Sequence, residues 1–192
     1  MKTFAALDGA ILVDKPAGPT SHDVVGMVRR IFGTRKVGHA GTLDPMATGM
    51  LVVGVGRATR LLGYLGATDK EYVATIRLGV ATTTDDAQGQ PLGRPSDVRL
   101  TDSDVHSALQ QFTGTIQQRP SSVSAIKVDG KRAHALVRAG HDIELAARTV
   151  DIGELAVLGV KRVDGFVDVD VRVTCSAGTY VRAIARDVGQ LL

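Results

Sequence analysis

Residues 10–32 read AILVDKPAGPTSHDVVGMVRRIF, and this stretch contains the signals for a strand, a turn and a helix in that order. The apolar run at 10–14 predicts a short buried strand, which the proline and glycine that follow end. Thr20 or Ser21 is a suitable N-cap for a helix that continues to residue 32. Three apolar residues spaced for one helix face are predicted to pack inward: Val24, Val28 and Ile31.

Two later segments carry no such periodicity and are predicted to be loops. Residues 33–49 hold five glycines and prolines among basic and polar residues. Residues 82–95 are polar and contain glycine, which predicts a surface loop. Long irregular segments in compact domains often carry function, so the first of these loops is a candidate for chemistry.

The rest of the chain is rich in strands. Tyr72 begins a strand in which alternate residues up to Leu78 share one face. Three β-rich runs lie between residues 143 and 174, the last two separated by Val163-Asp164-Gly165, and a final helix follows near Val181. Strands and helices do not alternate regularly, so we predict an α+β fold with a mixed, mostly antiparallel sheet flanked by helices.

Composition narrows the class of protein. With 192 residues, of which 44% are hydrophobic and 22% charged, the chain fits a folded domain rather than a disordered or fibrous protein. Its longest apolar run is far shorter than the ~18–20 residues of a spanning helix, and no signal segment opens it. We therefore expect a cytoplasmic protein without membrane association. The single cysteine, Cys175, and the dispersed histidines show no metal-binding spacing.

The predicted C-terminal helix has no capping signal. Its apolar face, which includes Ile184 and Val188, is still continuing at Leu191 and Leu192. A helix usually closes with a glycine or asparagine just beyond its last turn. We therefore expect these 192 residues to be part of a longer protein.

Positive charge is distributed unevenly along a chain of net charge +3. Residues 1–70 hold nine Lys and Arg against five Asp and Glu, and residues 117–138 hold five Lys and Arg against Asp129 alone. Such stretches can contact phosphates, although solvated surface charge gives the same pattern. The sequence contains no P-loop, dinucleotide fingerprint or serine-nucleophile elbow.

Within the loop at 33–49, Asp44 is the best candidate for chemistry. Glycines on both sides allow the backbone to approach a ligand closely, and Pro45 restricts Asp44 to extended conformations. This geometry suits a single presented carboxylate. The alternative is a turn in which Asp44 only accepts hydrogen bonds from nearby backbone N–H groups.

Four separated segments make the pattern specific. They are residues 11–21 (ILVDKPAGPTS), 35–49 (RKVGHAGTLDPMATG), 69–72 (DKEY) and 176–182 (SAGTYVR). In this order they resemble the motifs of the TruB-type tRNA pseudouridine-55 synthases. The resemblance covers nearly the whole chain. It implies that residues 1–192 form a pseudouridine synthase catalytic domain, truncated at its C-terminal end and without the PUA domain of the family.

The resemblance also implies a reaction and its catalytic residues. Members of the family isomerise one uridine of the tRNA T-loop, at position 55, by breaking its N1–C1′ bond and rejoining the base through C5, without a cofactor or a metal. By similarity, Asp44 is the essential carboxylate, and it either attacks C1′ or removes the C2′ proton; the sequence leaves both routes open. Arg182 would lie against that carboxylate. Tyr72 would stack on the target base and help to remove the C5 proton.

Five further residues would bind the substrate. His39 corresponds to the histidine that occupies space beside the extruded nucleotide, and Tyr180 would line the same pocket. Arg35, Lys36 and Arg60 would contact phosphates of the T-arm. The uridine must be flipped out of its stack before the enzyme can reach it. The expected partner is tRNA; we expect no protein partner and a monomer.

Two other functions stay open. The first is an RNA-binding or tRNA-folding module that keeps the pocket without using its chemistry. The second is a carboxylate-dependent glycoside hydrolase. Such an enzyme normally needs a second acid, and none lies near Asp44 in the sequence.

Overall fold

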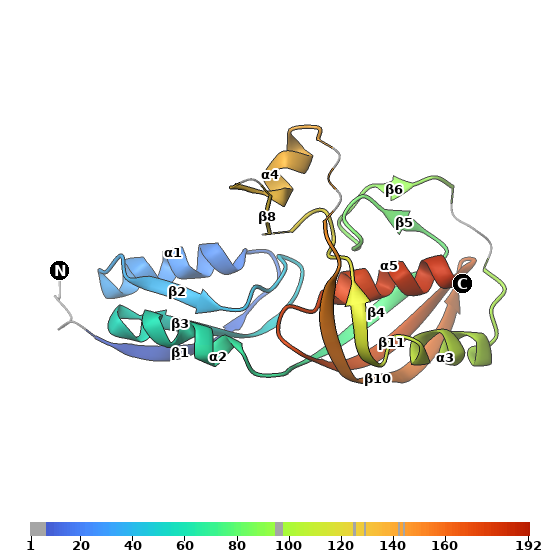
Figure 1. The fold of residues 1–192 in the computed structure, drawn as a ribbon, viewed down its shortest axis with the longest axis horizontal. Coiled ribbons are helices and arrows are strands. Elements are labelled where there is room, and N and C mark those ends of the chain that lie inside the picture. Colours follow the sequence, from blue (N-terminus) through green and yellow to red (C-terminus); the bar gives the residue numbers. More distant parts are fainter. Residues whose placement is uncertain (1–6, 95–97, 125, 129, 142, 144) are drawn as a thin grey trace. The chain divides into compact units, whose positions relative to one another are not determined.

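The computed structural model describes residues 7–94, 98–124, 126–128, 130–141, 143 and 145–192. The chain divides into two units, residues 1–68 and residues 69–192, and Figure 1 labels most of their elements. Strand pairing throughout the described chain is antiparallel, and both units contain helices. The predicted α+β class is therefore confirmed. Among the described residues, no helix combines the length and apolar character needed to cross a membrane.

The first unit is built on a three-stranded sheet. Its elements are β1 (Gly9–Lys15), α1 (Ser21–Phe32), β2 (Val37–Ala40), β3 (Gly49–Val55), the 3₁₀ helix η1 (Gly56–Leu61) and α2 (Leu62–Gly66). Strand β3 lies between β1 and β2. The core of this unit joins valines of α1 to apolar residues of β2 and β3: Val24, Val25, Val28, Val37, Leu51, Val53 and Val55.

Helix α1 begins and ends where its sequence predicts. The Thr20 side chain accepts a hydrogen bond from the backbone N–H of Asp23, and the Asp23 carboxylate accepts one from the N–H of Thr20, which completes a capping box. Gly33, at φ 62°, ends the helix in the left-handed conformation. The predicted inward position of Ile31 is wrong, because this side chain is 63% exposed and Val25 is buried instead. The valine stripe contacts the sheet, and in the last turn Phe32, rather than Ile31, packs against the same core.

The segment 33–49 is more regular than its sequence predicts, because it contains β2. Gly38 and Gly54 face each other in the pairing of β2 with β3, and the Leu62 side chain packs where their Cβ atoms would be. A four-residue strand with one buried apolar side chain gives no alternation signal. The prediction of a loop is therefore wrong for residues 37–40, where pairing with a neighbouring strand determines the structure.

The second unit is built on a four-stranded antiparallel sheet of order β4-β11-β10-β7. Its elements are β4 (Lys70–Leu78), β5 (Ala81–Thr82), β6 (Pro91–Leu92), α3 (Asp102–Gln110), β7 (Gly114–Gln118), β8 (Lys127–Val128), β9 (Lys131–Arg132), α4 (Ala133–Arg138), β10 (Arg148–Val163), β11 (Phe166–Cys175) and α5 (Val181–Leu191). Helices α3 and α5 contribute to one core with the sheet, through buried residues that include Val105, Leu109, Ile184 and Val188. Leu191 and Leu192, predicted on the same face of α5, are exposed.

Alternation along β11 gives the sheet one buried face. Every second residue from Val167 to Cys175 is buried, while Asp168 and Asp170 point to the opposite face and pair with cations of neighbouring strands. The turn predicted at Asp164-Gly165 joins β10 to β11, and both residues have the positive φ of a two-residue hairpin turn (52° and 82°). The prediction of three β-rich runs between residues 143 and 174 is wrong, because the described residues of this range form two strands, β10 and β11, and β10 continues over 16 residues.

Candidate active site

Asp44 is half-buried on the loop between β2 and β3, and hydrogen bonds fix both of its neighbours. On one side, the backbone N–H of Leu43 donates to Oγ of Ser21 (2.9 Å), and this hydroxyl donates to the carbonyl oxygen of Leu43 (3.0 Å). On the other side, the carbonyl oxygen of Pro45 accepts from the backbone N–H of Gly18 (2.8 Å). The backbone is therefore held on each side of Asp44, which keeps the carboxylate in one position, as catalysis by a single carboxylate requires.

Lys15, the last residue of β1, adds a buried positive charge to this loop. Its side chain is fully buried, and its ammonium donates to the carbonyl oxygens of Pro16 (2.9 Å), Pro19 (2.9 Å) and Pro45 (3.1 Å). Burial lowers the pKa of Lys15 because the charged form loses hydration, while the carboxylate of Asp44 acts in the opposite direction. The ammonium thus ties three carbonyl groups together and attracts the candidate catalytic carboxylate.

The other residues predicted in the first unit differ in exposure. His39 is half-buried in β2, and its Nδ1 contacts the carbonyl oxygen of Gly41, three residues before Asp44. Arg35 and Lys36 precede β2 and are exposed, as is Arg60 in η1. Exposed cations such as these can contact phosphate oxygens at little desolvation cost.

In the second unit, both predicted tyrosines are half-buried. Tyr72 lies on β4 opposite Val173 of β11 and packs against the core. Tyr180 is the N-cap residue of α5: its N–H donates to Oε1 of the buried Gln118 (2.8 Å), whose Nε2 donates to the Tyr180 carbonyl oxygen (3.1 Å). Gln118 belongs to no motif that would single it out, yet it fixes the start of α5 two residues before Arg182.

Arg182 has a carboxylate partner within the second unit. Its Nη1 donates to Oδ2 of Asp86 (3.2 Å) and to the carbonyl oxygen of Thr84 (3.0 Å). Its Nη2 donates to the carbonyl oxygen of Val123 (3.2 Å). Asp86 also accepts hydrogen bonds from the Thr84 hydroxyl (2.6 Å) and the Gln88 N–H (3.0 Å). The side chains of the pair are only 14% and 9% exposed, so this is a buried, well-oriented ion pair.

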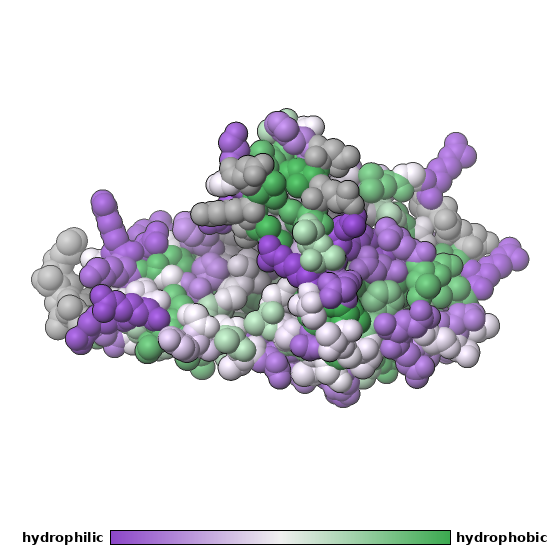
Figure 2. Space-filling view, viewed as in Figure 1, coloured by the Kyte–Doolittle hydropathy of each residue, from purple (hydrophilic) through white to green (hydrophobic). Residues whose placement is uncertain are grey.

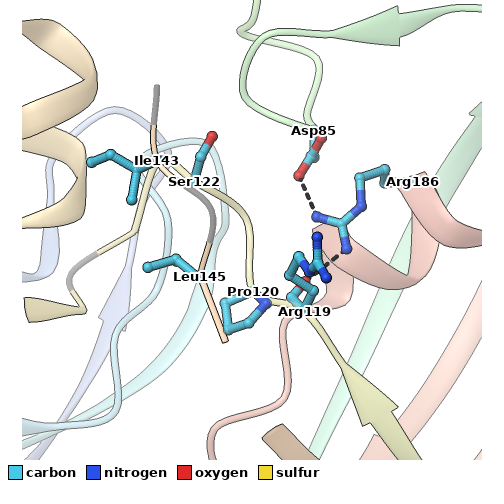
Figure 3. Close-up of a pocket in the computed structure, with 7 residues that line it drawn as sticks. All are labelled: Asp85, Arg119, Pro120, Ser122, Ile143, Leu145 and Arg186. Carbon is cyan, nitrogen blue, oxygen red and sulfur yellow. Dashed lines mark hydrogen bonds and ion pairs between the residues drawn. The ribbon is translucent and has the colours of Figure 1, made fainter. Parts of the chain in front are cut away.

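Arg186 repeats this arrangement one helical turn later. Its guanidinium donates to the carboxylates of Asp187 (2.8 Å) and Asp85 (3.1 Å) and to the carbonyl oxygen of Arg119 (2.7 Å); the last two bonds are drawn in Figure 3. Residues four apart share a helix face, so Arg182 and Arg186 together hold two consecutive carboxylates of one loop. Hydrophilic residues gather beside α5 and β5 on the face shown in Figure 2.

The segment 82–95 is therefore more than the surface loop that its composition predicts. It delivers Asp85 and Asp86 to α5, from positions about a hundred residues earlier in the chain. Two sequence features are compatible with this role: adjacent acids in the loop, and Arg182 and Arg186 four residues apart on the last helix. Neither feature specifies the pairing.

Asp44 and Arg182 belong to different units, so their predicted contact stays a prediction. The same holds for a pocket shared by His39, Tyr72 and Tyr180. In the described part of the chain, no group of three or more His, Cys, Asp or Glu residues is placed to hold a metal ion.

Comparison with known families gives the chain its relatives. The model of the TruB family pseudouridylate synthases (N-terminal domain) matches residues 29–181. The chain belongs to this family. The matched range contains Asp44, Tyr72 and Tyr180 and ends one residue before Arg182.

Curated relatives are similar over almost the whole chain. The tRNA pseudouridine synthase B of Mycobacterium sp. (strain KMS) is 63% identical over 184 residues, which are 96% of this chain and 62% of that protein. The tRNA pseudouridine synthase B of Thermobifida fusca (strain YX) is 60% identical over 186 residues, which are 95% of this chain and 64% of that protein. The chain thus spans about three fifths of the length of these relatives.

Solved structures share the fold. A Cbf5-Nop10-Gar1 complex contains a chain that matches with a TM-score of 0.68 and 31% identity, over 96% of this chain and 44% of that one. An H/ACA RNP bound to a substrate RNA containing 2′-deoxyuridine matches with a TM-score of 0.66 and 29% identity, over 96% and 43%. These likenesses confirm the predicted pseudouridine synthase fold.

Proposed function

We propose that this chain is the catalytic domain of a tRNA pseudouridine synthase that isomerises uridine 55 of the T-loop. The observation that carries the proposal is the family match over residues 29–181, a range that contains the fixed Asp44 loop. The 63% identity to a tRNA pseudouridine synthase B supports tRNA as the substrate. Isomerisation neither oxidises nor reduces the uridine, and the family resemblance implies a reaction without a cofactor or a metal.

Asp44 is the catalytic carboxylate of this proposal. The reaction breaks the N1–C1′ bond and forms a C5–C1′ bond; the C5 hydrogen leaves as a proton and N1 gains one. Ionised Asp44 either attacks C1′ and forms a covalent intermediate or removes the C2′ proton. Both routes need a charged carboxylate in a fixed place. The hydrogen bonds that hold Leu43 and Pro45 fix the backbone on each side of Asp44, and the Lys15 ammonium favours its charged form.

Arg182 is proposed to face Asp44 and favour its ionised form, since a guanidinium stays charged at physiological pH. Asp86 is then a positioning residue, because the ion pair with Arg182 fixes the direction of the guanidinium. Tyr72 stacks on the target base and helps to remove the C5 proton, and Tyr180 lines the same pocket.

The RNA is proposed to bind with the target base everted. A stacked base hides C1′ and C5, and flipping it out costs about a few kcal/mol. His39 occupies the space beside the everted nucleotide, while Arg35, Lys36 and Arg60 contact phosphates of the T-arm and position the RNA without reading its sequence. A tRNA substrate implies a cytoplasmic protein, and one chain supplies every residue named, so we expect a monomer.

Mapping of pseudouridine tests the proposal. Unmodified tRNA is sequenced for pseudouridine before and after incubation with the full-length protein, with a transcript carrying cytidine at position 55 as the control. We expect one new pseudouridine at position 55 of the uridine transcript. Binding without conversion would indicate a non-catalytic module, and free uracil with an abasic site would indicate a glycoside hydrolase; either result contradicts the proposal.

A further inference from the structure

Arg186 connects α5 to two earlier segments of the second unit (Figure 3). Its Nη1 donates to Oδ2 of Asp85 (3.1 Å), in the loop between β5 and β6. Its Nη2 donates to the carbonyl oxygen of Arg119 (2.7 Å), the residue that follows β7. The Arg186 side chain is only 20% exposed. Because a guanidinium is a rigid, planar fork, these two bonds fix the loop and the segment relative to the helix.

The loop between β5 and β6 also holds Arg182. Asp85 lies between the two residues of this loop that accept hydrogen bonds from Arg182, which are Thr84 and Asp86. Asp85 adopts φ 57°, a left-handed conformation that is unfavourable for a residue other than glycine and that persists only where surrounding contacts maintain it. The ion pair with Arg186 is such a contact. It therefore helps to keep the loop in the conformation that presents Asp86 to Arg182.

The segment after β7 supports Arg182 as well. Gln118, which directly precedes Arg119, holds the backbone at the start of α5. The carbonyl oxygen of Val123, four residues after Arg119, accepts a hydrogen bond from Nη2 of Arg182 (3.2 Å). Both long-range bonds of Arg186 thus end in segments that fix either the Arg182 guanidinium or the start of its helix.

The charges around Arg186 do not favour a direct role in RNA binding. Its Nε donates to the carboxylate of Asp187 (2.8 Å), so that all three guanidinium nitrogens have an acceptor within the protein. The carboxylates of Asp85 and Asp187 together offset the positive charge of Arg186. A phosphate group would therefore meet little net positive charge at this position.

We propose that Arg186 is a positioning residue that acts on catalysis through Arg182. It keeps the loop with Asp86 in place, and Asp86 in turn directs the Arg182 guanidinium. The inference rests on the function proposed above, in which Arg182 faces Asp44 and favours its ionised form. Without Arg186, Asp86 holds Arg182 less firmly, so that the catalytic step becomes slower while RNA binding is retained.

A double-mutant cycle with full-length protein and T-arm stem-loop RNA tests this role. Wild type, Arg186→Gln, Asp86→Asn and the combined variant are compared by the rate of pseudouridine formation in a single turnover, with protein in excess. RNA affinity is measured by fluorescence anisotropy. Arg162→Gln is the matched control, because Arg162 donates to a carboxylate and to a carbonyl oxygen at an exposed position of the same unit. Circular dichroism shows which variants fold, and Arg186→Lys, which keeps the charge, replaces Arg186→Gln in the cycle if the latter does not fold.

We expect Arg186→Gln to slow conversion about ten- to a hundredfold without loss of RNA affinity, because a small displacement of a catalytic group has an effect of this size. The combined variant should be no slower than the slower single variant, because both changes remove the same support of Arg182. Arg162→Gln should convert RNA at the wild-type rate.

Three results would overturn the proposal while the wild type is active: conversion by Arg186→Gln at the wild-type rate, a loss of affinity in place of rate, or losses that multiply in the combined variant. The first shows that Arg186 does not affect catalysis, the second that it binds RNA, and the third that it acts independently of Asp86. Wild-type protein that binds RNA without converting it would overturn the proposed function, and this inference with it.

Discussion

Replacement of Asp86 by alanine should destabilise the protein far more than the same change in an exposed ion pair. Asp86 and Arg182 are 9% and 14% exposed, so both charges are poorly hydrated in the folded state. The change removes a carboxylate from the guanidinium and an acceptor from the Thr84 hydroxyl and the Gln88 N–H. Removal of one partner of a buried ion pair costs about 3–5 kcal/mol.

The matched comparison is Asp102→Ala, because Asp102 and Arg162 form an ion pair that is 61% and 51% exposed. An exposed pair contributes about 0–1 kcal/mol. Urea unfolding of the two full-length variants measures both values. Asp86→Asn, which keeps the side-chain size, should also lower kcat more than it raises KM if Asp86 directs Arg182. Loss of stability in Asp86→Ala no greater than in Asp102→Ala would refute the reasoning.

Three other predictions concern the first unit, the sheet and the RNA. Lys15→Met should lower the free energy of unfolding by roughly 3 kcal/mol, because three carbonyl oxygens lose a charged donor. It should also slow pseudouridine formation, because the Asp44 loop loosens. An unchanged free energy of unfolding in urea would contradict this. The hydrogen bond from Arg77 lowers the pKa of Asp168 from its ordinary value of 3.8. Ionised Asp168 therefore stabilises the folded protein above pH 3.8, and this contribution is lost as the pH falls through the lower pKa of the folded state. Unfolding free energies of the wild type and Asp168→Asn should therefore converge below pH 3.8, and a difference that stays constant there would be inconsistent with the ion pair. Finally, the three phosphate contacts proposed for Arg35, Lys36 and Arg60 predict that log affinity for T-arm RNA falls with log salt at a slope of roughly −2 to −3, whereas a flat response would exclude these contacts.

Elements determined by local chemistry could be predicted from the sequence. The capping residue Thr20 marks the start of α1, and Asp164-Gly165 marks the hairpin turn because both positions need positive φ. The alternation from Tyr72 to Leu78 identifies β4. In each case the signal and the structure that it determines lie within a few residues of one another.

Features that depend on distant partners could not be predicted in this way. Strand β2 exists through its pairing with β3, and the role of Asp86 depends on an arginine 96 residues away. Lys15 is part of a quoted motif, but a lysine at the end of a strand is usually exposed, so its burial is not evident from sequence. The roles of the site residues come from the family resemblance.

The most direct test of the central claim is release of the C5 hydrogen by a variant without the Asp44 carboxylate. Full-length wild type, Asp44→Asn and the control Asp102→Asn are incubated with tRNA that carries tritium at C5 of uridine, and tRNA affinity is measured in parallel. We predict that Asp44→Asn binds tRNA as the wild type does but releases no tritium above background, while Asp102→Asn releases it at the wild-type rate. Tritium release by Asp44→Asn close to the wild-type rate would contradict the account.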